Sequence, residues 1–190
     1  MRSWHLISVC FLVVWFAGCS EPTAGGSTDT ETGALAGLAT LSDGSRVANA
    51  RVVAYPASQA VVPAEPIRQG ISSSEGAYRL EGLPAGRWTL EFVAVDGRRG
   101  LLQDLVVTSA VVTNRDAVLH TPGRIRLSTS VDTSAPWVEG TGHIGRIRGG
   151  FWVVDSIPAG VPLVLRRGMG NASRIVALLA LAPAQDTLVP

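Results

Sequence analysis

The chain has no lysine, few charges and almost no net charge. Of its 190 residues 16% are charged, its 16 basic residues are all arginine, and 15 acidic residues leave a formal net charge of +1. An average soluble domain has about 25% charged residues. The balanced charge argues against a nucleic-acid-binding protein, which needs a basic face to neutralise phosphates. The apolar fraction of 46% argues against an intrinsically disordered chain.

The sequence also lacks an apolar run long enough to cross a membrane as a helix. Near its start, residues 6–16 are apolar except for Ser8, whereas a membrane-spanning helix needs about 20 apolar residues. This run follows Arg2 and has the length of the hydrophobic region of a secretory signal peptide. We therefore interpret residues 1–18 as a signal peptide.

Cysteine is scarce, and its position is informative. The segment Phe16-Ala17-Gly18-Cys19 resembles the lipobox of bacterial lipoproteins, in which Leu usually stands where this chain has Phe16. The resemblance implies a diacylglycerol thioether on Cys19, cleavage before it and acylation, for example with palmitate. Cys10 is then lost with the signal peptide, so the mature chain contains no disulfide. An ordinary signal peptide followed by a chance cysteine is the alternative.

After the cysteine comes a segment without large apolar residues. Residues 20–33 are rich in glycine, serine and threonine, a composition typical of a flexible tether. We expect residues 19–33 to form a lipidated tether. Ser20 rather than aspartate follows the cysteine. By the sorting rule of enteric bacteria, this residue directs the protein to the outer membrane.

From residue 34 onwards, apolar residues come in short runs separated by turn signals such as Asp43-Gly44 and Pro84-Ala85-Gly86. In one run Trp88, Leu90 and Phe92 alternate with polar residues, as on a strand with one buried face. This pattern predicts an all-β fold of the sandwich type. The runs are 34–41, 51–55, 78–80, 88–95, 101–107, 111–119, 151–154, 161–165 and 175–181.

One pattern occurs twice, in residues 76–86 and 150–160. Each copy has a glycine, an aromatic residue two places on, an aliphatic and then an acidic residue, and finally aliphatic-Pro-Ala-Gly. Proline fixes φ at the corner and glycine permits a sharp exit, so a strand should return antiparallel after it. We therefore expect two tandem, Greek-key-like β-sandwich modules, 34–121 and a shorter, less regular one at 122–190.

The first module resembles a known family. Residues 33–37, 43–52, 73–80 and 82–90 together resemble a carboxypeptidase regulatory-like domain, also described as a transthyretin-like or prealbumin-like sandwich. The resemblance implies a non-catalytic accessory or adhesion-type domain of the bacterial envelope. Ser74-Glu75-Gly76 stands where Asp-x-Gly is common, which weakens the case for a calcium site.

Signals of catalysis or metal binding are almost absent. There is no Gly-x-Ser-x-Gly or His-Glu-x-x-His motif. His120 and His143 have no cysteine or carboxylate cluster at zinc-ligand spacing, and we expect both to be exposed at strand ends. A triad of Ser128 or Ser130 with His143 and Asp155 has no local support. The sequence therefore predicts no enzyme activity, no metal and no cofactor.

A candidate binding surface lies in the second module. Trp137 is the one aromatic platform to consider, with core packing as its alternative interpretation. Arg146 and Arg148 alternate with an isoleucine and form a candidate anion-binding patch, with a merely solvated strand as the alternative. Other arginines of this module are Arg124, Arg126, Arg166 and Arg167.

These features predict a non-enzymatic lipoprotein of the bacterial envelope, attached to the membrane through its lipid. It is expected to bind or scaffold protein or polysaccharide partners, and no nucleic acid, through loops or sheet edges on a rigid fold. The first alternative is a purely structural spacer in an envelope assembly. The second is a hydrolase whose site has no recognisable motif.

Overall fold

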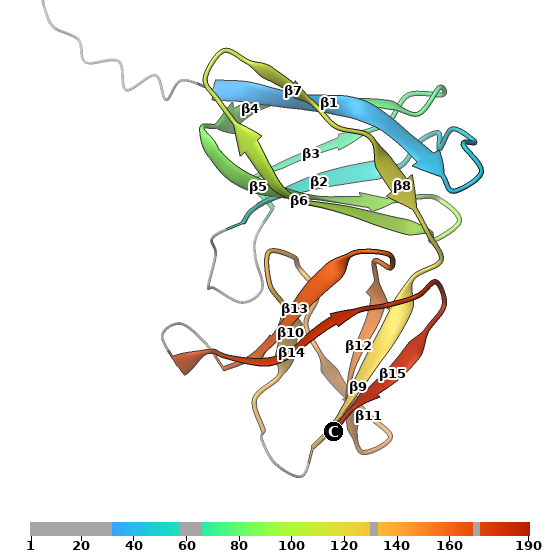
Figure 1. Ribbon diagram of the computed structural model, residues 1–190, viewed down its shortest axis with the longest axis vertical. Helices are drawn as coiled ribbons and strands as arrows, with labels where there is room; N and C mark the ends of the chain where they lie inside the picture. The colour runs from blue at the N-terminus through green and yellow to red at the C-terminus, as the bar shows by residue number, and fades with distance from the viewer. Residues whose placement is uncertain (1–31, 58–65, 130–132, 169–171) are drawn as a thin grey trace, which may run out of the picture.

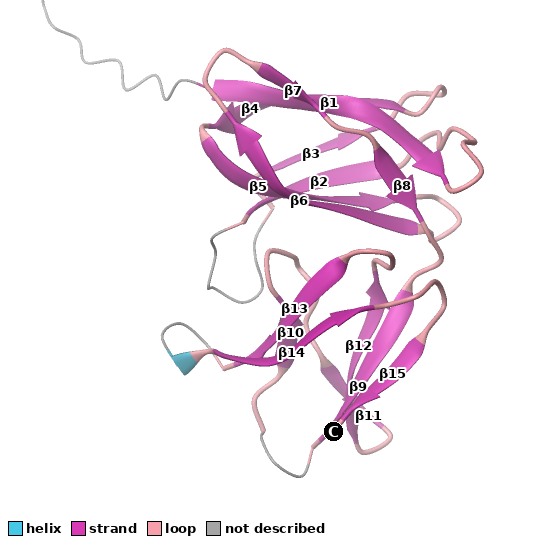
Figure 2. Cartoon of the chain, in the orientation of Figure 1, coloured by secondary structure: helices cyan, strands magenta, loops and turns pink. Residues whose placement is uncertain are grey.

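The computed structural model describes residues 32–57, 66–129, 133–168 and 172–190, and these residues form an all-β protein. Strands joined by loops make up four sheets (Figure 2). The predicted β-sandwich fold is confirmed. The predicted signal peptide and Cys19 lie outside the described residues. Within the described ranges, no helix is long and apolar enough to span a membrane.

The first half of the chain forms two facing sheets, here called the N-terminal sandwich (Figure 1). One sheet has the order β4-β1-β7, with β8 also pairing with β1, and the other has the order β3-β2-β5-β6. β1 runs antiparallel to β4 but parallel to β7 and β8. The strands are β1 (Thr32–Leu41), β2 (Arg51–Pro56), β3 (Arg68–Ile71), β4 (Ala77–Pro84), β5 (Gly86–Val93), β6 (Arg99–Val107), β7 (Val112–Asn114) and β8 (Ala117–Leu119).

An apolar core fills the space between these two sheets. Trp88, Leu90 and Phe92 of β5 all point into it, as their alternation predicts. Tyr78 of β4 packs edge-on against Phe92, with ring centroids 4.9 Å apart. Each large apolar side chain buried in this way stabilises the fold by about 1.5–3 kcal/mol.

The second half forms the C-terminal sandwich, which lies below the first in Figure 1. Its sheets have the orders β10-β13-β14 and β11-β12-β9-β15, and β15 runs parallel to β9. The strands are β9 (Gly123–Ser128), β10 (Pro136–Val138), β11 (Arg146–Arg148), β12 (Phe151–Ile157), β13 (Pro162–Arg167), β14 (Arg174–Ala180) and β15 (Asp186–Val189).

A second apolar core lies between these sheets. β9 contributes Ile125 and Leu127, while β13 contributes Leu163 and Leu165 from the facing sheet. Leu101 of β6 also belongs to this cluster, although its strand is part of the N-terminal sandwich. The two halves are therefore in contact through packed side chains.

The sequence repeat corresponds to a repeated corner in the structure. β4 leads through a corner into β5, and β12 leads through a corner into β13; in each case the second strand joins the opposite sheet. The two strands at each corner do not pair with each other, and the second strand brings Trp88 or Leu163 into the core from the opposite sheet. Gly82 and Ser156 occupy equivalent positions and both have positive φ, at 70° and 57°. Leu83 and Ile157, which follow them, are fully buried.

Several strands differ from the expected runs. Five strands fall outside them, because they are short or alternate arginine with apolar residues: β3, β9, β10, β11 and β15. Residues 111–119 form two strands, since Asp116 at the break accepts a hydrogen bond from the Leu38 amide through its side chain at 2.9 Å. β14 confirms the predicted strand near residues 175–181, and β1 begins at Thr32, within the expected tether.

Candidate functional site

The outer face of the sheet β11-β12-β9-β15 is strongly charged. Along β9, Ile125 and Leu127 point into the core, so Arg124 and Arg126 lie on the opposite face. Asp186 of β15 pairs in register with Arg124. We call this surface the arginine face: Arg124, Arg126, Arg146, Arg148, Asp155 and Asp186.

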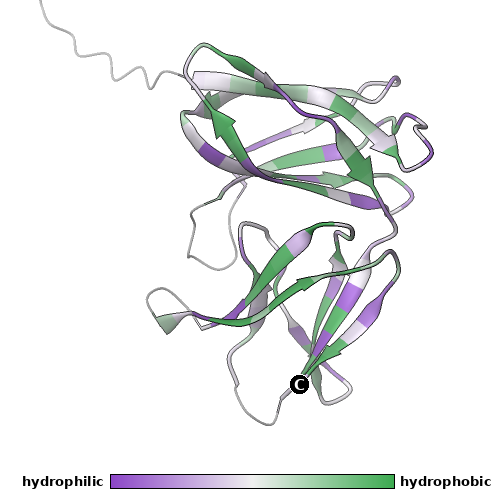
Figure 3. Ribbon diagram, viewed as in Figure 1, coloured by the Kyte–Doolittle hydropathy of each residue, from purple (hydrophilic) through white to green (hydrophobic). Residues whose placement is uncertain are grey.

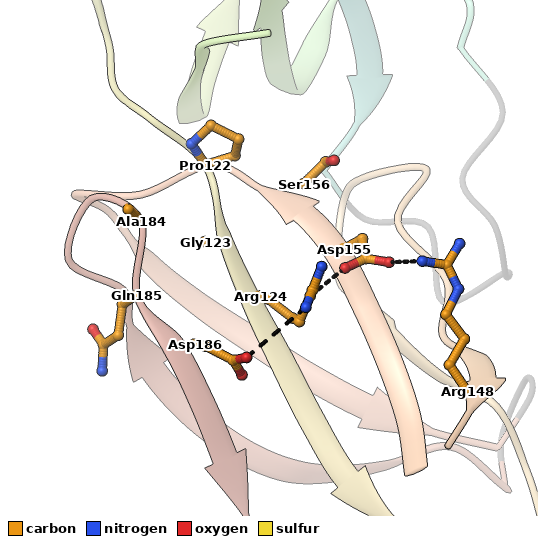
Figure 4. A pocket seen from close by; sticks show the side chains of 9 residues that line it. All are labelled: Pro122, Gly123, Arg124, Arg148, Asp155, Ser156, Ala184, Gln185 and Asp186. Atoms are coloured by element: carbon orange, nitrogen blue, oxygen red, sulfur yellow. Dashed lines mark hydrogen bonds and ion pairs between the residues drawn. The ribbon is translucent and has the colours of Figure 1, made fainter. Parts of the chain in front are cut away.

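A chain of ion pairs crosses the arginine face from strand to strand (Figure 4). Asp155 accepts hydrogen bonds from Arg124 Nε at 2.5 Å and from Arg148 Nη1 at 2.8 Å. Asp186 accepts one from Arg126 Nε at 2.8 Å, and its other oxygen lies 3.9 Å from Arg124 Nη1. These bonds orient guanidinium groups of two strands, β9 and β11, through carboxylates on β12 and β15.

Two polar hollows border the ion pairs. One has a volume of about 570 Å³ and is lined by Arg124, Arg148, Asp155 and Asp186 together with the corner residue Ser156. The other, of about 230 Å³, is lined by the loop before β11 and again by Arg148 and Asp155. The Arg148–Asp155 pair therefore separates two openings of the surface.

The arginine face has two more positive than negative side chains. Arg146 forms no ion pair with any residue that the structure describes. Exposed ion pairs such as Arg148–Asp155 contribute only about 0–1 kcal/mol, so an anionic ligand can replace the carboxylate at small cost. A guanidinium presents a planar fork of donors that fits carboxylates and phosphates.

Trp137 does not belong to this surface. It is 1% exposed, and its indole N–H donates a hydrogen bond to the Gly168 carbonyl at 3.0 Å. The structure thus favours core packing over the aromatic platform. Arg146 and Arg148, by contrast, are exposed on β11.

His143 has a partner that the sequence did not reveal. The imidazole Nε2 lies 2.8 Å from Glu91 Oε1, and the His143 side chain is only 12% exposed, so the expected exposed position is wrong. Arg99 Nη1 donates to the same Glu91 oxygen. Among the described residues the catalytic triad considered above does not form, because His143 is bound to Glu91 and Asp155 is bound to arginines. Ser130, the alternative nucleophile, lies outside the described residues.

Glu91 is a buried carboxylate between the two sandwiches. It lies on β5 opposite the core-facing side chains and is only 3% exposed. Burial raises the pKa of Glu91, but the hydrogen bond and charge of His143 and the charge and hydrogen bond of Arg99 outweigh it. Its pKa is therefore lowered from the usual 4.5. The ionised form is stabilised although it is removed from water.

The loop that carries His143 fits closely onto the N-terminal sandwich. A Cβ atom added to Gly140 would lie 3.0 Å from Thr89 Oγ1, and one added to Gly142 would lie 3.1 Å from the Tyr55 hydroxyl oxygen. These glycines allow the loop to approach sheet β3-β2-β5-β6 closely. Together with Glu91 they make a contact that holds the two sandwiches in a defined arrangement.

No group of three or more potential metal ligands occurs within the described ranges. His120 is half-buried, and its backbone pairs with that of Arg99 at the junction of the sandwiches. The chemistry that the arginine face offers to a ligand is ion pairing and hydrogen bonding through its guanidinium groups.

No protein-family model matches this chain, and no curated protein matches it by sequence. The similarity to carboxypeptidase regulatory-like domains therefore stays a prediction.

Several solved structures show limited similarity. The TIE protein of Bacillus anthracis is 11% identical with a TM-score of 0.33, over 83% of this chain and 33% of that one. A streptococcal ancillary pilin is 13% identical with a TM-score of 0.27, over 85% of this chain and 62% of that one. A minor pilin of Streptococcus agalactiae is 10% identical with a TM-score of 0.34, over 83% and 93%. This chain thus spans less than two thirds of the first two proteins, and likeness at this level assigns no function.

Proposed function

We propose that this protein is a lipid-anchored, non-enzymatic binding module of the bacterial envelope, built on carboxypeptidase regulatory-like sandwiches. The lipobox-like residues Phe16 to Cys19 support the anchor, and Ser20 supports the outer membrane as its location. Two acyl chains or more give stable attachment. Two tandem modules, 34–121 and 122–190, would then be held off the membrane by the tether.

The observation that carries the binding function is the arginine face. Its two excess positive charges, its fixed guanidinium groups and the two hollows beside Arg148 suit an anionic partner, either an acidic protein surface or an acidic polysaccharide. Recognition would rest on replacing weak exposed ion pairs with bonds to the partner's carboxylates or phosphates.

The test is capture of partners by the full-length, tagged protein from envelope extract, with proteins and glycans both identified by mass spectrometry. The variant is Arg146→Ala combined with Arg148→Ala. Its matched control is Arg79→Ala combined with Arg87→Ala, which removes two exposed, ion-paired arginines from the N-terminal sandwich.

An anionic partner that binds the wild type and the control but not the variant supports the proposal. Its binding should weaken as salt is raised, because exposed charges are screened. Equal capture by variant and control contradicts a role for the arginine face.

The anchor is tested separately with Cys19→Ala. The variant is expected to lose membrane retention, and the wild type to show the added mass of a diacylglycerol and an acyl chain. Retention of the unmodified variant would contradict lipidation.

A structural spacer is the second candidate, and the buried link between Glu91, Arg99 and His143 favours it. A fixed arrangement of two sandwiches suits a rigid element that sets a distance. If loss of the arginines leaves function in the cell intact while disruption of this link abolishes it, the spacer is the better description.

A further inference from the structure

The two hollows of the arginine face differ in charge. The hollow of about 570 Å³, here called the large hollow, is lined by two arginines and two aspartates, so its charges cancel. The hollow of about 230 Å³, here called the small hollow, is lined by Arg146 and Arg148 but by a single carboxylate, that of Asp155. The small hollow therefore has an excess positive charge, and an anion is attracted to it rather than to the large hollow.

The two arginines of the small hollow lie on one side of β11. They are two residues apart, so their side chains share a face of the strand. Val153, which pairs with Arg146 across the ladder, is 7% exposed and adds an apolar side to the hollow. In Figure 3 the alternation of hydrophilic and hydrophobic residues along β9, in the same sheet, shows the same division into a charged and a core-facing side. Among the described residues only Arg148 of this pair is already bound to a carboxylate, so Arg146 is available to a ligand.

His143 also lines the small hollow. Its Nε2 lies 2.8 Å from Glu91 Oε1. Glu91 is ionised at neutral pH, since its pKa is lowered from 4.5, and an ionised carboxylate can only accept, so Nε2 carries the hydrogen. Within the described ranges this is the only hydrogen bond of the ring, and Nδ1 is left as the nitrogen that takes up or releases a proton. A protonated His143 adds a second excess positive charge to the lining.

An imidazole makes the charge of this region depend on pH. The other titratable or charged groups around His143 are Glu91 on β5, Arg99 on β6, Tyr55 on β2, Arg146 and Arg148 on β11 and Asp155 on β12. In the same loop, Glu139 is bound to Arg166. Carboxylates and guanidinium groups keep their charge between pH 5.5 and 8. Burial and the charge of Glu91 raise the pKa of Tyr55 from 10, so its hydroxyl stays neutral. Imidazole, by contrast, takes up a proton in this range.

We propose that the small hollow binds one carboxylate or phosphate group of the anionic partner, and that protonation of His143 tightens this binding. Arg146 and Arg148 donate hydrogen bonds to the group, and the protonated ring adds its charge. Because such coupling is reciprocal, the bound anion favours the protonated ring, which strengthens its pair with Glu91 between the two sandwiches. This inference rests on the proposed function, since the small hollow belongs to the arginine face, and adds to it a subsite and a control by pH.

The test is an NMR titration of the full-length protein in a non-ionic detergent at low salt. Glucuronate is the carboxylate probe and dimethyl phosphate the phosphate probe, and both keep a single negative charge between pH 5.5 and 8. A bound probe should shift the ring signals of His143 but not those of His120, which does not line this hollow. The dissociation constant should be about threefold or more lower at pH 5.5 than at pH 8, the factor that one charge about 6 Å away gives even in water. The probe that binds more tightly identifies the group on the partner.

Three variants locate the site. Arg146→Ala should raise the dissociation constant about tenfold or more. Arg79→Ala is its matched control, because Arg79 is an exposed, ion-paired arginine of the N-terminal sandwich, and it should leave the constant unchanged. His143→Gln keeps an N–H donor for Glu91 but takes up no proton, so the tightening at pH 5.5 should disappear. This variant also assigns the ring signals, and circular dichroism verifies that each variant is folded.

Three results would each overturn the inference: no shift of the His143 signals with either probe, equal dissociation constants at the two pH values, or equal binding by Arg146→Ala and Arg79→Ala. The first and third of these tests need no His143 variant and decide the matter even if His143→Gln does not fold. An envelope partner captured through the arginine face, without binding of either probe, would refute the small hollow and leave the proposed function standing. Probe binding at the small hollow without any captured partner would do the reverse.

Discussion

Glu91→Gln directly probes the contact between the two sandwiches. The substitution keeps the size of the side chain and one acceptor oxygen but removes the charge that Arg99 and His143 share. Removing one partner of a buried ion pair costs about 3–5 kcal/mol. Because glutamine still accepts one hydrogen bond, we expect a loss of about 2–3 kcal/mol in the free energy of unfolding at pH 7, near the value for a hydrogen bond to a charged group.

The effect should depend on pH in a defined direction. The pKa of Glu91 is lower in the folded protein than its usual 4.5. Its contribution to stability is therefore fully present above the unfolded-state value, about 4.3, and is lost as the pH falls through the lowered pKa. The wild type should lose its advantage over Glu91→Gln in that acidic range.

The assay is urea-induced unfolding, followed by tryptophan fluorescence at several pH values. Glu81→Gln is the matched control, since Glu81 is an exposed carboxylate paired with Arg79 and should change stability by less than about 1 kcal/mol. A Glu91→Gln loss no larger than that of Glu81→Gln, or a difference that does not change with pH, would refute the reasoning.

Three further substitutions have clear expectations. Gly37→Ala would place a Cβ 1.8 Å from the Arg115 carbonyl oxygen, so thermal unfolding should show a severe loss of stability or no folded protein. Tyr78→Phe removes a 2.6 Å hydrogen bond to the same carbonyl and should cost about 0.5–1.5 kcal/mol in urea unfolding. Trp137→Ala should cost about 3–5 kcal/mol in the same assay, because the side chain is buried and bonded to Gly168; a small loss would contradict its place in the interior.

Much of the N-terminal sandwich could be predicted because its strands alternate clearly. Trp88, Leu90 and Phe92 show period two, and the corner around Pro84 is marked by proline and glycine. The apolar pattern does not predict β9, because the alternation on this strand is less clear. Its arginines interrupt the apolar pattern, although Ile125 and Leu127 are core residues.

The contact between the sandwiches could not be predicted from alternation. A polar residue such as Glu91, placed between core-facing neighbours, indicates a strand with a solvent-facing side. The sequence does not tell that another part of the chain covers this side, because His143 is 52 residues away. The sequence predicts Arg146 and Arg148 as part of the arginine face but not its two carboxylates. Asp155 and Asp186 lie beside the arginines only because β12 and β15 pair with β9.

The position of β1 has a mechanical consequence. It is the first strand after the predicted tether, and it is bonded on both sides, to β4 on one and to β7 and β8 on the other. A pulling force that enters at Thr32 acts along this strand and loads its hydrogen bonds in shear, many at once, rather than opening them one after another. In the anchored protein proposed above, the strand that follows the tether is thus bonded along both of its edges and should resist extraction.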